Sequence, residues 1–245
     1  MKQHEAVIQT MERLGGVATL GQLYQEVLKI PDCKWGTKTP FATIRRIVQL
    51  CPEIYKIKPG LYGLVAFRKR NEAKGILAET QENKGSREIQ ISNHSYYQGL
   101  LLTLGNLKHF DTFAPNQDKN RRFLDKMLGE VRTLAKIPPF SYPNLVERSA
   151  TIDVIWFNQR GMPNSFFEVE FSGNMENSLI KYSDLQDFFV RMFIVADKSR
   201  RAEYKIRIGR SSFEEIEHRV DFLDFDSLVK QYEQEIERQE LEVVI

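Results

Sequence analysis

The chain has little cysteine and no long apolar run. Its two cysteines, Cys33 and Cys51, lack the CxxC spacing of a redox pair or a zinc site, so we expect both to be free thiols. No apolar stretch approaches the roughly 20 residues of a membrane span. The residues from Met1 to Glu5 lack the apolar core of a signal peptide. These absences predict a cytoplasmic protein that does not enter the membrane.

Nucleotide-binding and zinc-protease motifs are also missing. The sequence has no GxGxxG loop and no GxxxxGKS or GxxxxGKT loop, and its four histidines form no HExxH motif. Nucleotide-driven activity within this chain is therefore not expected. His94 and Gln98 stand one helical turn apart and share a face. They could line a cleft, although a core or capping role is the commoner outcome for such a histidine.

The composition is that of a globular protein with an uneven charge distribution. The chain is 42% hydrophobic and 28% charged, and its 245 residues allow one large domain or two ordinary ones. Residues 1–70 hold 12 basic and 5 acidic residues, a net charge of +7, whereas residues 211–245 hold 3 basic and 11 acidic residues, a net of −8. A basic N-terminal region suits a polyanionic partner, and an acidic tail suits a solvated or subunit-facing helix.

The first 67 residues show the pattern of a winged helix-turn-helix domain. Apolar spacing predicts helices over residues 3–14 and 19–30. Thr39 followed by Pro40 marks the start of a third helix that runs to Leu50. Two short strands then flank a Pro-Gly turn, at residues 54–58 and 61–65. Three helices followed by a hairpin are the layout of a winged helix.

A second domain of α/β type is expected over residues 92–245. Residues 68–91 are polar and are interpreted as a linker, with a short helix near residues 73–82. Helices are predicted at residues 94–109, 120–135, 176–189 and 225–239, and strands at 152–157, 166–171, 192–196 and 204–208. Helices on both sides of a small mixed sheet, with the first two strands forming a hairpin, give the core of this domain.

Three carboxylates stand within the apolar strands of that hairpin. Because side chains alternate along a strand, Glu168 and Glu170 point to the same face, and Asp153 lies near the start of the neighbouring strand. A buried carboxylate needs a cation, hydrogen bonds or a proton. Mg²⁺ prefers oxygen ligands and suits this set. The alternative is that Asp153 caps its strand and the glutamates face solvent on an edge.

These residues resemble the motif of PD-(D/E)XK nucleases of the restriction-endonuclease type, and the resemblance covers residues 92–230. It implies that Asp153 and Glu168 bind Mg²⁺ and that Glu170 assists metal binding or orients water. Glu170 departs from the family pattern, which usually has lysine there. Lys181, on the following helix, is a candidate replacement that stabilises charge on the phosphate, and its alternative is an ordinary solvated lysine.

Residues 1–65 resemble a HARE-type winged helix, a module found beside restriction enzymes, chromatin proteins and an RNA polymerase subunit. The resemblance rests on the segments Trp35–Pro40, Thr43–Arg46 and Pro59–Leu64. It implies DNA recognition by polar residues of the third helix, namely Thr43, Arg45, Arg46 and Gln49. Phosphate contacts would come from Lys34, Lys38, Lys56 and Lys58. The alternative is a protein-binding winged helix with solvated charges.

Together these patterns predict a Mg²⁺-dependent, type II restriction-like endonuclease that cleaves double-stranded DNA at a specific or modified site. Cutting both strands needs two active sites, so we expect a homodimer, and a cognate methyltransferase would be encoded separately. Two alternatives stay open: a catalytically inactive DNA-binding regulator, or a protein-interaction module that uses the winged helix. The cluster from Asp197 to Arg201, after the strand at 192–196, is either a phosphate-binding loop or a solvated turn.

Overall fold

The computed structural model describes residues 1–83 and 85–242, which form two compact units. Residues 1–92 and the described residues from Val229 onward make up the N-terminal unit, and residues 93–228 make up the C-terminal unit. The last helix was expected within the second domain, yet most of its length belongs to the N-terminal unit. Residue 84, in the expected linker, and residues 243–245, at the end of the expected second domain, lie outside the described residues.

The N-terminal unit contains helices and strands close to the predicted ones. In chain order they are α1 (Gln3–Arg13), β1 (Val17–Thr19), α2 (Leu20–Val27), α3 (Pro40–Leu50), β2 (Ile54–Lys58) and β3 (Leu61–Leu64). The strands form an antiparallel sheet in the order β1-β3-β2. The three predicted helices and the predicted hairpin are therefore confirmed as elements.

Local sequence signals account for where these elements begin. Thr19 caps α2, because its hydroxyl accepts a hydrogen bond from the Gln22 amide while the Gln22 side chain accepts one from the Thr19 amide. Pro40 occupies the first turn of α3, where its missing N–H costs nothing. Gly60 takes a φ of 71° in the turn between β2 and β3, a conformation that glycine adopts without strain.

The last helix, α11 (Phe225–Glu242), packs closely on α2 within the N-terminal unit. The Tyr232 hydroxyl and the Thr19 hydroxyl lie 3.1 Å apart, and both residues are buried. Gly21 makes this approach possible, because a Cβ there would lie 2.4 Å from a methyl carbon of Ile236. The short element η1 (Val65–Phe67) follows β3, and the expected linker begins with α4 (Arg68–Ala73), so the short helix lies earlier than the predicted residues 73–82.

A mixed five-stranded sheet forms the centre of the described C-terminal unit, in the order β10-β9-β8-β7-β4. These strands are β4 (Asp111–Phe113), β7 (Val154–Phe157), β8 (Pro163–Glu170), β9 (Arg191–Ala196) and β10 (Val220–Asp224). The β4-β7 and β7-β8 pairs are antiparallel, and the β8-β9 and β9-β10 pairs are parallel. The predicted α/β class, the mixed sheet and the β7-β8 hairpin are confirmed.

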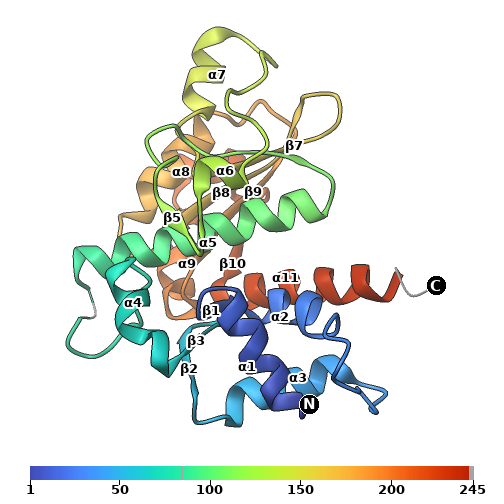
Figure 1. The fold of residues 1–245 in the computed structure, drawn as a ribbon. Coiled ribbons are helices and arrows are strands. Elements are labelled where there is room, and N and C mark those ends of the chain that lie inside the picture. Colours follow the sequence, from blue (N-terminus) through green and yellow to red (C-terminus); the bar gives the residue numbers. More distant parts are fainter. Residues whose placement is uncertain (84, 243–245) are drawn as a thin grey trace. The chain divides into compact units, whose positions relative to one another are not determined.

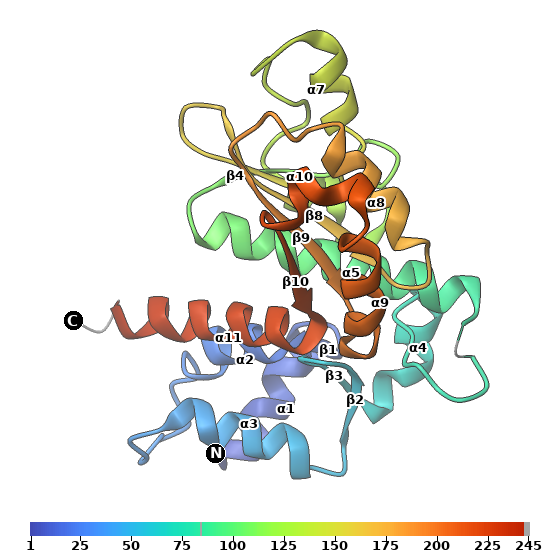
Figure 2. The same cartoon turned by 180° about the vertical axis from the view of Figure 1, so that it is seen from behind.

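Helices cover both faces of this sheet. One face carries α5 (Arg87–Leu107) (Figure 1). The Trp156 indole on β7 donates to the Leu101 carbonyl of that helix. The opposite face carries α8 (Met175–Ser183), α9 (Arg201–Ile208) and α10 (Glu214–Glu217) (Figure 2). The smaller elements are β5 (Arg122–Phe123), β6 (Lys126–Met127), α6 (Leu128–Val131), α7 (Pro143–Ser149), η2 (Lys198–Arg200) and η3 (Ser211–Phe213). Within the described ranges, none of the helices has the length and apolar character that crossing a bilayer requires.

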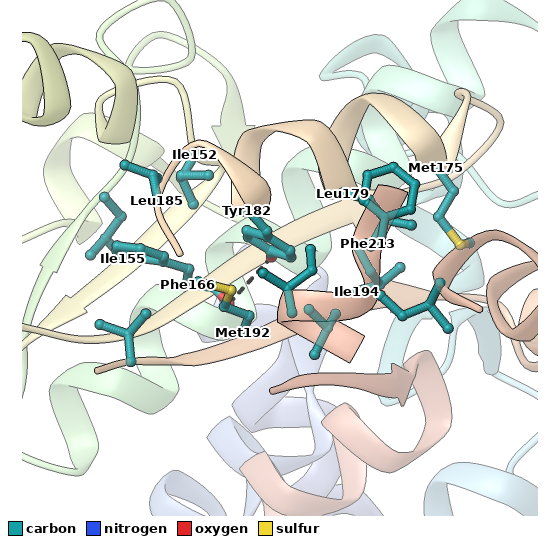
Figure 3. Packing of buried hydrophobic residues seen from close by; sticks show 14 of the residues in the cluster. Ile152, Ile155, Phe166, Met175, Leu179, Tyr182, Leu185, Met192, Ile194 and Phe213 are labelled. Atoms are coloured by element: carbon teal, nitrogen blue, oxygen red, sulfur yellow. Dashed lines mark hydrogen bonds between the residues drawn. The ribbon is translucent and has the colours of Figure 1, made fainter. Parts of the chain in front are cut away.

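The main core of the C-terminal unit lies between the sheet and α8. Phe166 on β8 and Met192 and Ile194 on β9 are fully buried there, against Leu179 and Tyr182 of α8 (Figure 3). The Tyr182 hydroxyl donates to the Phe193 carbonyl at 2.6 Å, so this buried polar group is satisfied. This core fixes α8 over the strand that carries Glu168 and Glu170.

Two predicted elements of the C-terminal unit are wrong. The helix expected at residues 120–135 is instead the β5-β6 hairpin followed by α6, and Leu124 takes a positive φ of 56° in the turn. The strand expected at residues 204–208 belongs to α9. Apolar and charged residues alternate there, but the buried pair is Tyr204 and Ile208, one helical turn apart, while Ile206 is 70% exposed.

Other predicted boundaries differ from the structure. Helix α5 begins seven residues before the expected start at residue 94, and α8 ends at Ser183 rather than Phe189. The edge strands β4 and β10 were not predicted. Both are short, and β10 carries acidic residues at Asp221 and Asp224, so neither has the apolar run of a central strand.

Gly99 on α5 allows Phe123 to pack against the helix. A Cβ at Gly99 would lie 2.1 Å from two ring carbons of Phe123, which is well inside van der Waals contact. We predict that Gly99→Ala lowers the free energy of unfolding by about 1–2 kcal/mol, because overpacking outweighs the better helix propensity of alanine. Thermal unfolding followed by circular dichroism measures the change.

Gly36→Ala is the control, because a Cβ at Gly36 meets no atom within 4 Å. It should leave the melting temperature nearly unchanged. A Gly99→Ala variant that melts at or above the wild-type temperature would contradict the close packing of α5 on Phe123.

Candidate active site

The structure brings Asp153, Glu168, Glu170 and Lys181 into one cluster within the C-terminal unit. The β7-β8 register pairs Val154 with Phe167, so Asp153, one residue earlier, comes opposite Glu168. Lys181 reaches the cluster from α8. Its ammonium donates to both Glu168 oxygens, at 3.0 and 2.8 Å, and to the Thr151 carbonyl at 2.9 Å. Four residues that were singled out from the sequence therefore meet at the end of the central hairpin.

The two glutamates are buried rather than solvated. Glu168 is 3% exposed and Glu170 is 9% exposed, and β8 lies between β7 and β9 inside the sheet. The alternative that these glutamates face solvent on an edge strand is wrong. The alternative of a freely solvated Lys181 is also wrong, because its side chain is 23% exposed and ion-paired.

Ser178 links the two glutamates and was not found from the sequence. This α8 residue is 2% exposed, and its hydroxyl lies within hydrogen-bonding distance of Glu168 Oε2, at 3.0 Å, and of Glu170 Oε1. A hydroxyl has one proton, so it cannot donate fully to two carboxylates at once. The second contact is satisfied when one of the carboxyl groups is itself protonated.

The pKa of Glu168 fits such a shared proton. Burial and the negative charge of Asp153 raise the pKa of Glu168 to about 8, against the opposing effect of Lys181 and Ser178. Without an added cation, the surroundings therefore favour the protonated form of Glu168.

Asp153 has the opposite tendency. Burial by itself raises the pKa of Asp153, but His94 and the Val169 amide outweigh that effect and hold this pKa below its ordinary value. Both contacts are made to one oxygen: Asp153 Oδ2 accepts from the Val169 amide at 2.8 Å and lies 3.2 Å from His94 Nε2. No hydrogen bond to the other oxygen, Oδ1, is found within residues 1–83 and 85–242.

His94 and Gln98 contact the cluster from α5. Gln98 is fully buried, and its amide nitrogen donates to the Asp153 carbonyl at 3.1 Å and to Asp118 at 2.9 Å. Because that nitrogen is used as the donor, the Gln98 oxygen faces His94 Nδ1 at 3.0 Å, and Arg121 Nη1 lies 3.2 Å from the same ring nitrogen. Burial lowers the pKa of His94, but the Asp153 charge outweighs burial and gives a net rise.

Two arginines border the cluster: Arg121, which was not found from the sequence, and Arg200, which belongs to the segment Asp197–Arg201. Arg121 is ion-paired with Asp118 at 3.1 Å, and its position was hidden by the wrongly predicted helix at 120–135. Arg200 lies 3.8 Å from Glu170 and is held by Glu203 and by the Gly173 carbonyl. Within the cluster from Asp197 to Arg201, Arg200 thus faces the acidic site. The signal for Arg121 in the sequence was only a charge in a segment predicted to be helical, whereas Arg200 stood in a charged cluster after a strand.

Carboxylate oxygens are suitable ligands for a hard divalent cation. In this structure, however, they already make contacts with other side chains of the protein. Across the described ranges, no group of three or more His, Cys, Asp or Glu side chains is arranged to hold a metal ion. Glu168 is paired with Lys181, Glu170 is bonded to Ser178, and Asp153 offers one oxygen. Mg²⁺ commonly takes one or two protein carboxylates and completes its shell with phosphate and water. Asp153 and Glu168 meet that smaller requirement.

The candidate DNA-contacting residues of the N-terminal unit differ widely in exposure. Arg46, Gln49, Lys34, Lys38 and Lys56 are exposed, and Thr43 is half-buried. Two other candidates, Arg45 and Lys58, are occupied inside the unit.

Arg45 makes ion pairs with the acidic helix α11. Its guanidinium lies 3.5 Å from Glu233 and 3.3 Å from Glu237, and it stacks over the Tyr24 ring at 5.9 Å. The Glu233 side chain is only 13% exposed. Burial raises the pKa of Glu233, and Arg45 opposes that rise. Arg45 therefore compensates a partly buried carboxylate in this structure.

Lys58 is 6% exposed, and its ammonium donates to the Ser92 hydroxyl at 2.9 Å. Burial lowers the pKa of Lys58 to about 7, although Glu79 attracts the charge. Between pH 7 and about 10.5, the ordinary lysine value, the unfolded chain holds a proton that the folded chain has released. The contribution of Lys58 to the free energy of unfolding therefore rises with pH across this window.

We predict that Lys58→Met removes this contribution. Any stability advantage of the variant over the wild type should be largest near pH 6 and should shrink steadily toward pH 10. Thermal unfolding of both proteins at pH 6, 8 and 10 tests this, and the difference between them cancels the other titrating groups. A difference in melting temperature that does not change with pH would rule out a lowered pKa at Lys58.

The chain was compared with known proteins. A family model described as the type II restriction enzyme NmeDI C-terminal domain matches residues 75–244, which is more than half of the chain. No curated protein and no solved structure matches it. The matched segment contains the whole carboxylate cluster around Glu168. The chain therefore belongs to the family of the type II restriction enzyme NmeDI C-terminal domain and is a restriction-endonuclease-like protein.

Proposed function

We propose that this protein is a Mg²⁺-dependent, type II restriction-like endonuclease that cleaves double-stranded DNA at a specific or modified site. The observation that carries the proposal is the contact of Lys181 with Glu168 at 2.8 Å, opposite Asp153, in a chain of a restriction enzyme family. Two acidic groups and a lysine are the components that a PD-(D/E)XK nuclease needs. Here the lysine comes from α8 rather than from the strand.

Asp153 and Glu168 would hold the metal ion, and Glu170 would assist through its bridge to Ser178. When bound, Mg²⁺ supplies positive charge that polarises the scissile phosphate and favours attack by water. Lys181 must release at least one Glu168 oxygen for this, and its ammonium is then free to stabilise charge on the phosphate. Arg200, beside Glu170, adds positive charge at the rim of the site.

The N-terminal unit would act as a winged helix that recognises the DNA. Its element order, from α1 through β1, α2 and α3 to the β2-β3 hairpin, supports this proposal. Arg46 and Gln49, both exposed on α3, are the best-placed groups for reading bases, with Thr43 beside them. Exposed Lys34, Lys38 and Lys56 would contact phosphate. Arg45 and Lys58 would contribute less, because each already has a partner within the protein.

Cleavage of both strands of a duplex needs two active sites, so a homodimer is the simplest active assembly. A separately encoded methyltransferase would protect the host DNA if the target is unmodified.

A catalytically inactive DNA-binding regulator is the second candidate. Two observations favour it: Glu170 stands where the family usually has lysine, and the carboxylates of the described site are already neutralised by the protein's own cations. The two candidates differ in whether a divalent cation leads to cleavage.

We predict that Glu168→Ala abolishes cleavage, by at least 100-fold, and leaves duplex binding largely intact. The variant removes a proposed metal ligand and the partner of Lys181 but changes no residue of the N-terminal unit. Plasmid cleavage with and without Mg²⁺ measures the effect on unmodified, methylated and hydroxymethylated DNA.

Glu176→Ala serves as the control, since Glu176 lies on α8 near the site but pairs with Arg207 and Arg210. It should cleave at close to the wild-type rate. Undiminished cleavage by Glu168→Ala would exclude the proposed site. Wild-type protein that binds duplex DNA but cleaves none of the substrates would favour the inactive regulator.

We predict that Arg46→Ala weakens duplex binding about tenfold and lowers the salt dependence of binding by about one counterion if Arg46 contacts phosphate. If it reads a base instead, the loss is confined to the preferred sequence. Fluorescence anisotropy at several salt concentrations separates these cases. Lys230→Ala, an exposed cation on α11, is the control and should bind normally. Unchanged affinity and salt dependence for Arg46→Ala would remove α3 from recognition.

A further inference from the structure

We propose that His94 and Gln98 form a positioning relay that fixes the orientation of Asp153. This inference rests on the proposed function, because it assigns the relay to the carboxylate that would hold the metal ion. The relay commits Asp153 Oδ2 to the protein and leaves Oδ1 for the cation. His94 and Gln98 are positioning residues that act through Asp153.

The first step is the orientation of the carboxylate. Asp153 Oδ2 is held on two sides, by the Val169 amide at 2.8 Å and by His94 Nε2 at 3.2 Å. Two donors on one oxygen prevent the carboxylate from rotating about its Cβ–Cγ bond. Oδ1, without a hydrogen bond in the described part of the chain, is then the oxygen available as a ligand.

The second step is the orientation of the imidazole. His94 Nδ1 lies 3.0 Å from the Gln98 oxygen, four residues along the same helix, and 3.2 Å from Arg121 Nη1. These contacts on Nδ1 fix the ring plane, so that Nε2 is directed at Asp153. Hydrogen bonds of this kind around a ligand set its orientation, and their loss typically costs 10–100-fold in metal affinity.

The third step is the anchoring of Gln98 itself. Gln98 is fully buried, and its amide nitrogen is shared between the Asp153 carbonyl, at 3.1 Å, and Asp118, at 2.9 Å. It therefore holds the backbone of Asp153 as well as the ring that orients its side chain. Asp118 is 2% exposed and paired with Arg121, which ties the relay to the loop before β5. A glutamine that only filled space in the core would not need polar contacts at both its amide oxygen and its amide nitrogen.

The test uses the full-length protein and Mn²⁺ alone as the probe, with binding measured by calorimetry. Wild type is compared with His94→Leu, His94→Gln and Gln98→Leu, and Asp153→Ala defines the loss of the ligand itself. In His94→Gln the side-chain amide can place a donor near the position of Nε2, whereas leucine supplies none. Circular dichroism melts ensure that each variant is folded at the temperature of the titration.

We expect His94→Leu to weaken Mn²⁺ binding by 10–100-fold and His94→Gln to recover affinity to within about threefold of wild type. Gln98→Leu should weaken binding in the same direction by a smaller factor. For cleavage, the metal concentration at half-maximal rate should rise in parallel, while the apparent KM for DNA stays constant. A merely structural role would weaken Mn²⁺ binding and DNA binding together, and His94→Gln would rescue neither.

Wild-type affinity for Mn²⁺ in both His94→Leu and Gln98→Leu would overturn the relay while leaving the nuclease proposal intact. Equal losses in His94→Gln and His94→Leu would also overturn it, because the ring itself, rather than its donor, would then be required. A wild-type protein that neither binds Mn²⁺ nor cleaves DNA would instead overturn the proposed function, and the relay with it.

Discussion

The C-terminal unit depends on the compensation of negative charge that is buried inside an apolar sheet. Glu168 is 3% exposed on a central strand, and an unpaired carboxylate there would be very unfavourable. Lys181 compensates the charge through an ion pair, and Ser178 adds a hydrogen bond. The raised pKa of Glu168 also favours its protonated, neutral form. A fold selected only for stability would place an apolar residue at this position. The retained charges therefore point to chemistry rather than to packing.

The two helices that flank the sheet have different tasks at this site. The apolar face of α8, with Leu179 and Tyr182, fixes it on the sheet, and its polar residues Ser178 and Lys181 then meet the glutamates. Helix α5 lies on the other face and supplies His94 and Gln98 to Asp153. The site is thus held by regular elements on both faces, which restricts side-chain motion more than loops would. Such rigidity suits a reaction that depends on the placement of charge.

Charge compensation also decides which cations of the N-terminal unit remain available. The sequence places Arg45 and Arg46 side by side on α3, but only Arg46 is exposed, because Glu233 and Glu237 of α11 pair with Arg45. The acidic C-terminal segment, which seemed suited to solvent or to another subunit, thus contributes structure to the basic N-terminal unit. Lys58 shows the same effect in another form, since it is buried and its ammonium donates to Ser92. Counts of basic residues in the sequence therefore overestimate the free positive charge.

The sequence by itself determined the α/β class, the three N-terminal helices with their hairpin, and the central acidic hairpin. Caps, turns and alternation are local signals, and they were enough for Thr19, Pro40 and the β7-β8 strands. It also identified Asp153, Glu168, Glu170 and Lys181 as a set. Only the tertiary structure decided that residues 120–135 form a hairpin and α6, and that residues 201–208 are helical, because burial against distant partners overrode local periodicity. It alone revealed Ser178, Asp118 and the Gln98 contacts, and the capture of Arg45 by α11, since each joins residues whose proximity no spacing in the sequence encodes.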